Sequence, residues 1–188
     1  MRVAQAEMDK SHKRIVEGAS RLMRKHGIET TSVNDVMKKA GLTHGGFYRH
    51  FDSKEELVSA ALENAFDEVL KLIEETYRVS GPVEGAERYY EHYLSEGHVK
   101  HPELGCPIAA LSVDVARSAV SVKGAFADGF GKVVDKLAQA TDGTSEELRA
   151  AAIRKISMLA GAVMIARASD PKTARDVLSA CRISSKDA

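Results

Sequence analysis

Proline stands at only four of the 188 positions, and this scarcity limits the fold more than any other feature. A proline inside a helix breaks it, whereas one in the first turn is tolerated. The prolines occur at positions 82, 102, 107 and 171, where helical patterns start or stop. No convincing run alternates apolar and polar residues at period two, as a half-buried strand would. The sequence therefore predicts an all-α fold.

The composition is that of a soluble globular protein. Hydrophobic residues make up 44% of the chain and charged residues 29%, which argues against low-complexity disorder. The longest apolar stretch, residues 158–166, is far shorter than the ~20 residues needed to span a bilayer. The first residues lack the apolar segment of a signal peptide. Two cysteines, Cys106 and Cys181, are too few for a disulfide framework. We expect a cytoplasmic protein with no membrane partner.

Charge is distributed unevenly along the chain. The whole sequence is neutral, with 27 Lys and Arg against 27 Asp and Glu, which argues against a uniformly basic, histone-like binder. Residues 1–56 carry 11 basic and 8 acidic side chains, whereas residues 57–188 carry 16 and 19. A mildly basic first segment on a mildly acidic remainder fits a small nucleic-acid-binding domain attached to a partner-binding body.

The first forty residues have the pattern of two helices. Residues 9–26 place apolar side chains at helical spacing, and Gly27 ends this helix. A second, short helix begins after Ser32, which forms a capping-box pair with Asp35. Gly41 then breaks this second helix.

A third short helix begins at Thr43, which is a suitable N-cap residue. Phe47 and Phe51 are four residues apart and are expected to point inward, which leaves a polar outer side. Residues 32–51 therefore have the helix–turn–helix pattern, in which the free polar face of the second helix fits the major groove of DNA.

Longer helices follow. Ser53 and Glu56 form a further capping box for a long helix that ends before Gly81-Pro82. Residues 97–105 are predicted to form a loop. We expect a domain boundary between residues 1–53 and residues 54–188, and additional helices at 83–96, 107–117, 119–140, 144–169 and 171–181.

Short motifs follow one another through residues 30–62. They are a Thr/Ser pair before the second helix, Ala40-Gly41, Phe47-Tyr48, His50-Phe51 and the run from Ser53 to Leu57. In this order they closely resemble the DNA-binding segment of the tetracycline-repressor (TetR) family. The resemblance covers residues 10–62, and the rest matches only in length and helical plan. It implies an amino-terminal three-helix domain, a larger ligand-binding and dimerisation domain, and a homodimeric regulator, usually a repressor, that a small molecule releases from a palindromic operator.

The resemblance and side-chain chemistry together predict the DNA contacts. Hydroxyl, imidazole and ammonium groups suit phosphates, whereas arginine reads guanine and asparagine reads adenine. The glycines depart from family members that carry larger residues there, and they let the backbone approach DNA closely. The expected phosphate contacts are Thr31, Ser32, Thr43, Tyr48, His50 and Lys54, the expected base readers are Asn34, His44 and Arg49, and the expected backbone contacts are Gly45 and Gly46.

The resemblance assigns effector binding and dimerisation to the body. A pocket of apolar and aromatic side chains suits an apolar or aromatic small molecule. Its expected lining is Phe66, Leu70, Ile73, Tyr77, Tyr89, Tyr93, Cys106, Ile108, Leu111, Phe126 and Phe130. In the family the last two long helices pair with those of a second subunit, which points to Ile153, Ile156, Leu159, Ala160, Val163 and Met164. Core packing within one chain explains the same stripe equally well.

Cys106 supports an alternative function. The segment around it resembles the start of the sixth helix in a subset of the family, some of whose members sense electrophiles through cysteine. A helix start lowers a thiol's pKa and favours the reactive thiolate. The other interpretation is a packed, inert cysteine.

Metal binding and catalysis find less support. His92, His98, His101 and Cys106 suit zinc, but their spacing matches no common zinc motif, so we expect no metal and no cofactor. The sequence contains no HExxH, GxSxG, P-loop or Rossmann glycine pattern, so we do not expect an enzyme. The remaining alternative is a helical interaction module that does not bind DNA.

Overall fold

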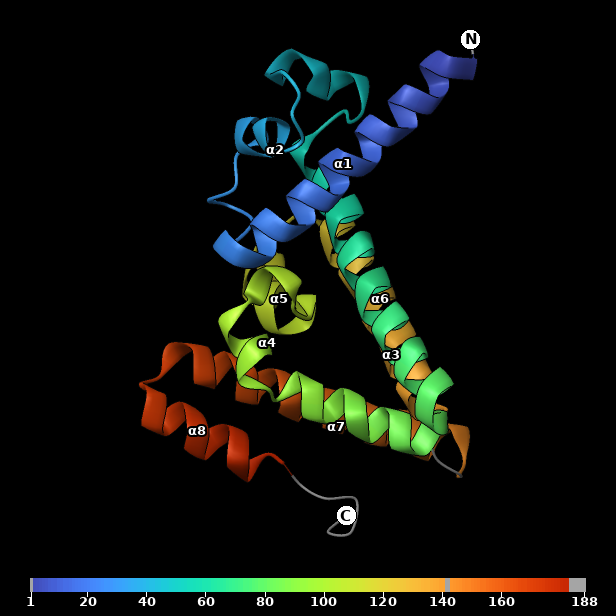
Figure 1. Ribbon diagram of the computed structural model, residues 1–188, viewed down its shortest axis with the longest axis vertical. Coiled ribbons are helices and arrows are strands. Elements are labelled where there is room, and N and C mark those ends of the chain that lie inside the picture. The colour runs from blue at the N-terminus through green and yellow to red at the C-terminus, as the bar shows by residue number, and fades with distance from the viewer. Residues whose placement is uncertain (1, 141–142, 183–188) are drawn as a thin grey trace.

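The computed structural model describes residues 2–140 and 143–182, and within these ranges it contains helices and no strand, which confirms the all-α prediction (Figure 1). No helix in these ranges is long and apolar enough to cross a membrane. In chain order the elements are α1 (Arg2–His26), α2 (Val33–Lys39), the 3₁₀ helix η1 (His44–Arg49), α3 (Lys54–Tyr93), α4 (Glu96–Lys100), the 3₁₀ helix η2 (Pro102–Leu104), α5 (Pro107–Ala116), α6 (Val120–Ala138), α7 (Ser145–Ala168) and α8 (Pro171–Ala180).

The head, which we define as residues 2–53, contains α1, α2 and η1 and lies at the upper end in Figure 1. Gly27 ends α1 with a φ of 90°, a left-handed conformation that favours glycine. The Ser32 side chain accepts a hydrogen bond from the Asp35 N–H, and the Asp35 carboxylate accepts one from the Ser32 N–H. The predicted capping box is therefore confirmed, and it fixes where α2 begins.

The remaining described residues form the body, and α3 joins it to the head. The Ser53 side chain accepts from the Glu56 N–H and caps α3. Gly81 has φ 78° and ψ 169°, so α3 consists of two helical segments that meet at a sharp bend before Pro82 (Figure 1). The first segment runs beside α6, and the second runs across the base of the molecule. The predicted end of a helix before Gly81-Pro82 is confirmed.

The buried apolar side chains form two clusters. The head cluster contains residues from α1, α2 and η1, but also Leu57 and Leu62 of α3, Leu111 of α5 and Val122 of α6. The body cluster contains Phe66 and Ile73 of α3 together with residues from α5 to α8. Because α3, α5 and α6 contribute to the head cluster, the head packs directly against the body.

Two local predictions were wrong. Residues 97–105 are not a loop, because Ser95 caps α4 by accepting from the His98 N–H, and Pro102 opens η2. The third helix is a 3₁₀ helix rather than an α-helix, and Thr43 makes no side-chain capping bond. Adjacent glycines at 45 and 46 are poor helix formers, which accounts for the irregular turn.

The packing of α3 on α6 gives a first prediction. A Cβ at Gly129 would overlap the ring of Phe66, whereas a Cβ at Gly131, two residues on in the same helix, would meet nothing within 4 Å. Gly129→Ala is expected to reduce the free energy of unfolding by about 1–3 kcal/mol, the usual cost of overpacking. Gly131→Ala is the control and should raise it by up to about 1 kcal/mol, because alanine favours helix. Urea denaturation of both variants measures the difference, and equal stability would contradict this close approach.

Candidate functional site

Two buried phenylalanines hold η1 against the rest of the head. Phe47 is 1% exposed and Phe51 3%, and their rings stack with centroids 5.7 Å apart. Val36 and Met37 of α2 are fully buried beside them. All four residues belong to the core, which confirms the prediction that Phe47 and Phe51 point inward. Because these side chains face inward, the opposite side of η1 faces solvent.

The outer side of η1 carries free polar groups. Tyr48 is 70% exposed, and its ring makes an edge contact with that of Phe47. His44 and Arg49 are exposed as well, and Arg49 makes no ion pair within residues 2–140 and 143–182. A large aromatic side chain and a guanidinium left in solvent are typical of a surface that binds a partner.

The glycines at the start of η1 differ from each other. A Cβ at Gly45 would meet nothing within 4 Å, whereas one at Gly46 would lie 3.5 Å from the Met37 side chain. Gly45 therefore exposes backbone on the outer side, and Gly46 packs toward α2. Only Gly45 occupies the position expected for close backbone approach to DNA.

The residues at the starts of α2 and α3 precede and follow η1 in the sequence, and several were predicted to contact DNA. Ser32 and Asn34 are exposed, and Lys54 is half-buried. The Ser32 hydroxyl donates to the Asp35 carboxylate over 2.5 Å, and this bond lowers the pKa of Asp35, which therefore remains ionised. An ionised carboxylate repels phosphate, so Ser32 is a weaker candidate phosphate ligand than the sequence suggested.

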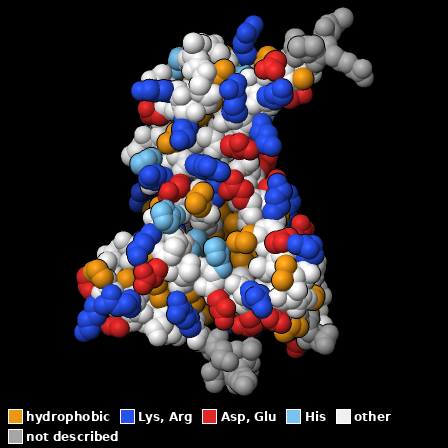
Figure 2. Space-filling model, viewed as in Figure 1, with side chains coloured by type: hydrophobic (Ala, Val, Ile, Leu, Met, Phe, Trp, Pro, Cys, Tyr) orange, Lys and Arg blue, Asp and Glu red, His pale blue; other side chains and the backbone are white. Residues whose placement is uncertain are grey.

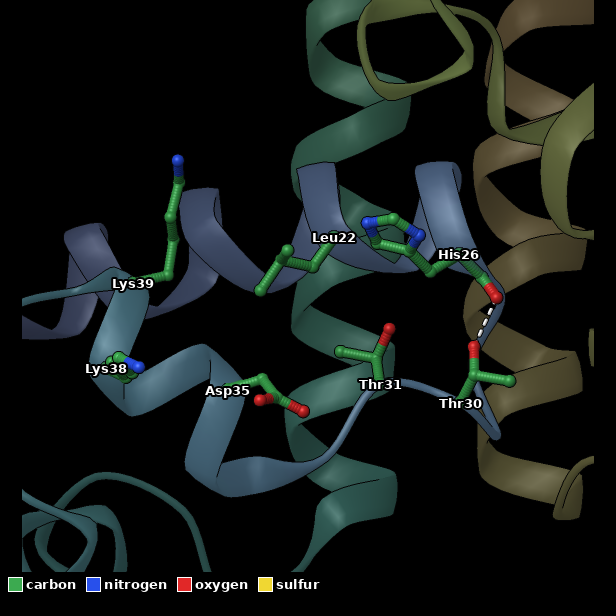
Figure 3. A pocket seen from close by; sticks show the side chains of 7 residues that line it. All are labelled: Leu22, His26, Thr30, Thr31, Asp35, Lys38 and Lys39. Carbon is green, nitrogen blue, oxygen red and sulfur yellow. Dashed lines mark hydrogen bonds between the residues drawn. The ribbon is translucent and has the colours of Figure 1, made fainter.

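Thr31 is poorly placed for the DNA contact predicted for it. Its side chain is buried, and its hydroxyl donates to the Gly27 carbonyl over 2.7 Å. Figure 3 shows the groove of about 530 Å³ between α1 and α2 that Thr31 lines together with Thr30, whose hydroxyl donates to the His26 carbonyl. Both hydroxyls therefore hold the turn between the helices.

His50 is half-buried at the end of η1, with its ring 5.8 Å from that of His12. Burial lowers its pKa, and the nearby His12 and Arg49 lower it further. The imidazole is therefore neutral at neutral pH. A neutral ring donates one N–H to a phosphate rather than supplying a positive charge.

Lys and Arg side chains are prominent over the head in the face shown in Figure 2, with Asp and Glu between them. This distribution agrees with the charge pattern of the sequence, in which residues 1–56 are net basic. The head is thus mildly rather than uniformly basic.

This arrangement corresponds to a known domain. Residues 15–61, from α1 through η1 into α3, match the family model of the bacterial regulatory proteins, tetR family. Residues 15–61 therefore form a DNA-binding domain of the TetR type. The resemblance read from residues 10–62 is thus confirmed.

Curated bacterial regulators are similar to this chain over part or most of its length. YfiR of Bacillus subtilis (strain 168), an uncharacterized HTH-type transcriptional regulator, is 31% identical over 75 residues, which cover 40% of this chain and 37% of YfiR. The HTH-type transcriptional regulator TtgR of Pseudomonas putida is 36% identical over 64 residues, covering 34% and 30%. Both matches span about a third of the relative's own length. An uncharacterized HTH-type regulator of Mycobacterium tuberculosis is 28% identical over 181 residues, 91% of each chain.

Solved structures extend the likeness in fold to the body. A TetR regulator from Legionella pneumophila has a TM-score of 0.75 at 20% identity, over 90% of this chain and 91% of that one. A TetR-family regulator from Cytophaga hutchinsonii has a TM-score of 0.78 at 18% identity, over 94% and 93%. The fold is therefore that of the family over head and body alike.

The predicted effector-binding residues lie mainly in the body core. Leu111 instead belongs to the head cluster. Tyr89, Tyr93 and Cys106 line a cavity of about 40 Å³, a volume that suits a water molecule and is too small for an aromatic compound. The others pack in or against the body cluster: Phe66, Leu70, Ile73, Tyr77, Ile108, Phe126 and Phe130.

Cys106 does not have the environment of a reactive thiol. It occupies the N-cap position of α5, as expected, but its side chain is buried and burial raises the pKa of the thiol. The prediction that the helix start would favour thiolate is wrong for this structure, because desolvation of the charged form outweighs it.

The histidines near Cys106 do not form a metal centre. Within residues 2–140 and 143–182, no group of three or more His, Cys, Asp or Glu side chains is placed to hold a metal ion. His98 is buried, and its Nε2 accepts from the Cys106 N–H over 2.9 Å. Its Nδ1 therefore carries the proton and donates to the Tyr93 carbonyl over 2.7 Å. Both ring nitrogens are used in holding the chain.

Most predicted dimer residues point into their own chain. Ile156, Leu159, Ala160 and Val163 belong to the body cluster, so four of the six are not available to a second copy. Ile153 and Met164 remain partly exposed. The sequence showed that α7 has an apolar stripe but could not show which partner covers it.

The sequence analysis did not identify two arginines that join distant segments, the buried Arg24 and the half-buried Arg167. Arg24 of α1 contacts Glu68 and the Gly105 carbonyl, and Arg167 of α7 contacts the carbonyls of His98 and Ala109. The sequence offered one indication that Arg24 is buried, namely its position directly after Met23, which is itself buried. Its partners lie 44 and 81 residues away, which no local pattern reveals.

His98 gives the second prediction. Burial lowers its pKa from 6.5 to about 4, so between these values the unfolded chain binds a proton that the folded chain does not. Stability should therefore fall as the pH drops from 6.5 to 4, by up to about 3 kcal/mol from this group. His98→Gln is expected to flatten that slope, whereas His92→Gln, on an exposed side chain of α3, should keep it. Urea titrations across the pH range compare them, and an unchanged slope in His98→Gln would refute the assignment.

Proposed function

We propose that this chain is a homodimeric transcriptional repressor of the TetR type that binds a palindromic operator and leaves it when a small molecule binds the body. The main support for the proposal is that Tyr48 and Arg49 face solvent on the outer side of η1. Phe47 and Phe51 are buried beneath them and hold this side outward. Residues 1–53 serve as the DNA-binding domain and residues 54–188 as the effector-binding and dimerisation domain.

The direct contacts divide by chemistry. His44 and Arg49 read base edges, and Asn34 contributes from α2. Thr43, Tyr48 and Lys54 bind phosphates, since the Thr43 hydroxyl is not used as a cap and Lys54 begins a long helix. His50 adds a neutral N–H donor. Gly45 brings the backbone close to the DNA.

Dimerisation follows from the small size of η1. One helix of six residues offers too few contacts for tight binding, whereas two copies one DNA turn apart read a palindrome. An exposed arc of α7 supports pairing with a second copy. It contains small and apolar residues at helical spacing: Ile153, Ser157, Gly161, Met164, Ile165 and Ala168.

The effector is an apolar or aromatic small molecule. The body core around Phe66, Tyr77 and Phe130 supplies the matching side chains. Release from DNA follows if the molecule binds best to a dimer in which the two η1 segments are wrongly spaced.

Selection of bound duplexes from a random DNA library, followed by footprinting, tests the proposal. Recovery of a palindrome of one or more helical turns supports it. Folded protein that enriches no sequence contradicts it and favours the helical interaction module.

The third prediction separates base reading from phosphate binding. Arg49→Ala is expected to weaken operator binding by about 1–3 kcal/mol and to relax preference at one base pair in each half-site. Lys54→Ala should weaken binding to all sequences alike and lower the salt dependence by about one phosphate contact per protomer. Fluorescence anisotropy with operator variants at several salt concentrations measures both. Uniform loss in both variants would show that Arg49 does not read a base.

The fourth prediction concerns the exposed arc of α7. A Cβ at Gly161 would meet nothing within 4 Å in the chain itself, so Gly161→Glu should fold but place a carboxylate in the dimer interface. We expect a monomer by sedimentation and at least about a hundredfold weaker binding to the palindrome, since one head alone binds poorly. Gly124→Glu, at an equally open position on α6, is the control and should stay dimeric. A dimeric Gly161→Glu would place the interface elsewhere.

A further inference from the structure

Arg24 belongs to the head, yet its side chain is 0% exposed at the border with the body. Its Nη2 donates to the Glu68 carboxylate over 2.6 Å, and its Nη1 donates to the Gly105 carbonyl over 2.8 Å. Its Nε bonds the Ser20 carbonyl one turn earlier in α1 over 3.2 Å. One guanidinium thus joins α1, α3 and the segment before α5.

The peptide that Arg24 holds is also held from the body side. The next amide, the Cys106 N–H, donates to His98 Nε2 over 2.9 Å. A Cβ at Gly105 would lie 2.6 Å from the same nitrogen and 3.2 Å from Arg167 Nη2, so no side chain fits there. The Gly105–Cys106 peptide is therefore fixed on both sides with no spare room.

Hydrogen bonds continue from this peptide to α7. Arg167 donates to the His98 carbonyl over 2.8 Å, to the Val99 carbonyl over 3.2 Å and to the Ala109 carbonyl over 3.3 Å. Direct bonds thus lead from Arg167 in the body, through His98 and the Gly105–Cys106 peptide, to Arg24 in the head.

A second polar contact between head and body is weaker. The Ile28 N–H donates to the Asp114 carboxylate over 3.4 Å, near the upper limit for a hydrogen bond. The bond from the Arg24 guanidinium to the Gly105 carbonyl is shorter, at 2.8 Å, and has a charged donor in a buried setting, so breaking it is more costly.

We infer that Arg24 is a positioning residue that makes operator binding depend on where the body holds the Gly105 carbonyl. A buried guanidinium that loses one of its acceptors strongly destabilises the folded chain. When the Gly105 carbonyl moves, α1 is therefore expected to move with it and keep the hydrogen bond. Because α1 carries much of the head core, its movement re-aims η1. The inference rests on the proposed function, since it names the route by which an event in the body reaches the DNA-binding surface.

The cavity of about 40 Å³ marks where such an event acts. It is lined by both Arg24 and Cys106, with Tyr89, Tyr93 and His98 around it. A rearrangement there acts directly on the Gly105–Cys106 peptide, because His98 accepts from the Cys106 N–H and Arg24 donates to the Gly105 carbonyl.

A double-mutant cycle tests the link. Gly105→Ala displaces the peptide, and it is introduced both into the natural chain and into Arg24→Met/Glu68→Leu, where an apolar pair replaces the ion pair. Such replacements generally preserve folding. The two readouts are affinity for the selected operator and hydrogen exchange of the amides in residues 19–26. Arg21→Met, an exposed arginine on the same helix, controls for loss of positive charge.

In the natural background, Gly105→Ala should weaken operator binding about tenfold and speed exchange in α1, a size typical of coupling between sites. In Arg24→Met/Glu68→Leu the same substitution should change operator affinity less than about twofold. Arg21→Met should leave the coupling intact. Equal effects of Gly105→Ala in both backgrounds would overturn the inference.

The test can still be read if Gly105→Ala does not fold or if the protein binds no preferred DNA sequence. If Gly105→Ala does not fold, His98→Ala serves instead, since it removes the acceptor of the Cys106 N–H and frees the same peptide. If the natural chain prefers no DNA sequence, the proposed function fails. The exchange cycle still decides whether Arg24 transmits movement of the peptide to α1, because that readout needs no DNA.

Discussion

The structure depends on one helical segment that serves two cores. The first part of α3 places Leu57, Val58, Ala61 and Leu62 in the head cluster and Phe66, Val69 and Ile73 in the body cluster. A straight helix of this length keeps both sets in fixed relation, because neither can rotate without moving the other. The bend at Gly81 then returns the chain beneath the body, where Tyr89 and Tyr93 close the second cluster. The head is therefore an extension of the body core rather than a domain on a flexible linker.

The shared core explains how so weak an element as η1 presents a surface. A six-residue 3₁₀ helix with two adjacent glycines has little stability of its own. It is held because Phe47 and Phe51 are buried against α1 and α2, where each aromatic side chain contributes about 1.5–3 kcal/mol. With its inner side committed to packing, η1 can leave glycine, tyrosine and arginine on the outer side. The buried side chains therefore hold the backbone of η1 in place, and the exposed side chains on its outer side are not needed for packing.

Local features of this fold could be predicted from the sequence, whereas contacts between distant segments could not. The capping box at Ser32, the break at Gly81 and the inward-facing Phe47 each depend on residues within one helical turn of each other. The use of the Thr31 hydroxyl inside a turn, the burial of Cys106 and the bonding of both His98 nitrogens depend on neighbours that packing brings together. For α7 the limit was geometric. Apolar residues lie on more than one face of α7, so the sequence does not show which face is buried. The observed packing shows that Ile156 and Val163 face inward, whereas Ile165, which is 52% exposed, faces outward.

Stability alone does not account for the buried Arg24. Replacing a buried ion pair with apolar side chains of similar volume often leaves stability unchanged or raises it, so a well-packed apolar contact would hold α1 on α3 equally well. An apolar contact, however, tolerates small sliding, whereas a planar guanidinium satisfies Glu68 and the Gly105 carbonyl together in only a narrow range of positions. The arrangement therefore fixes the register between head and body. Any residue at position 105 would supply the same backbone carbonyl, so the acceptor itself does not require glycine. Space does, because a Cβ there would lie 2.6 Å from His98 Nε2 and would displace the carbonyl that Arg24 binds.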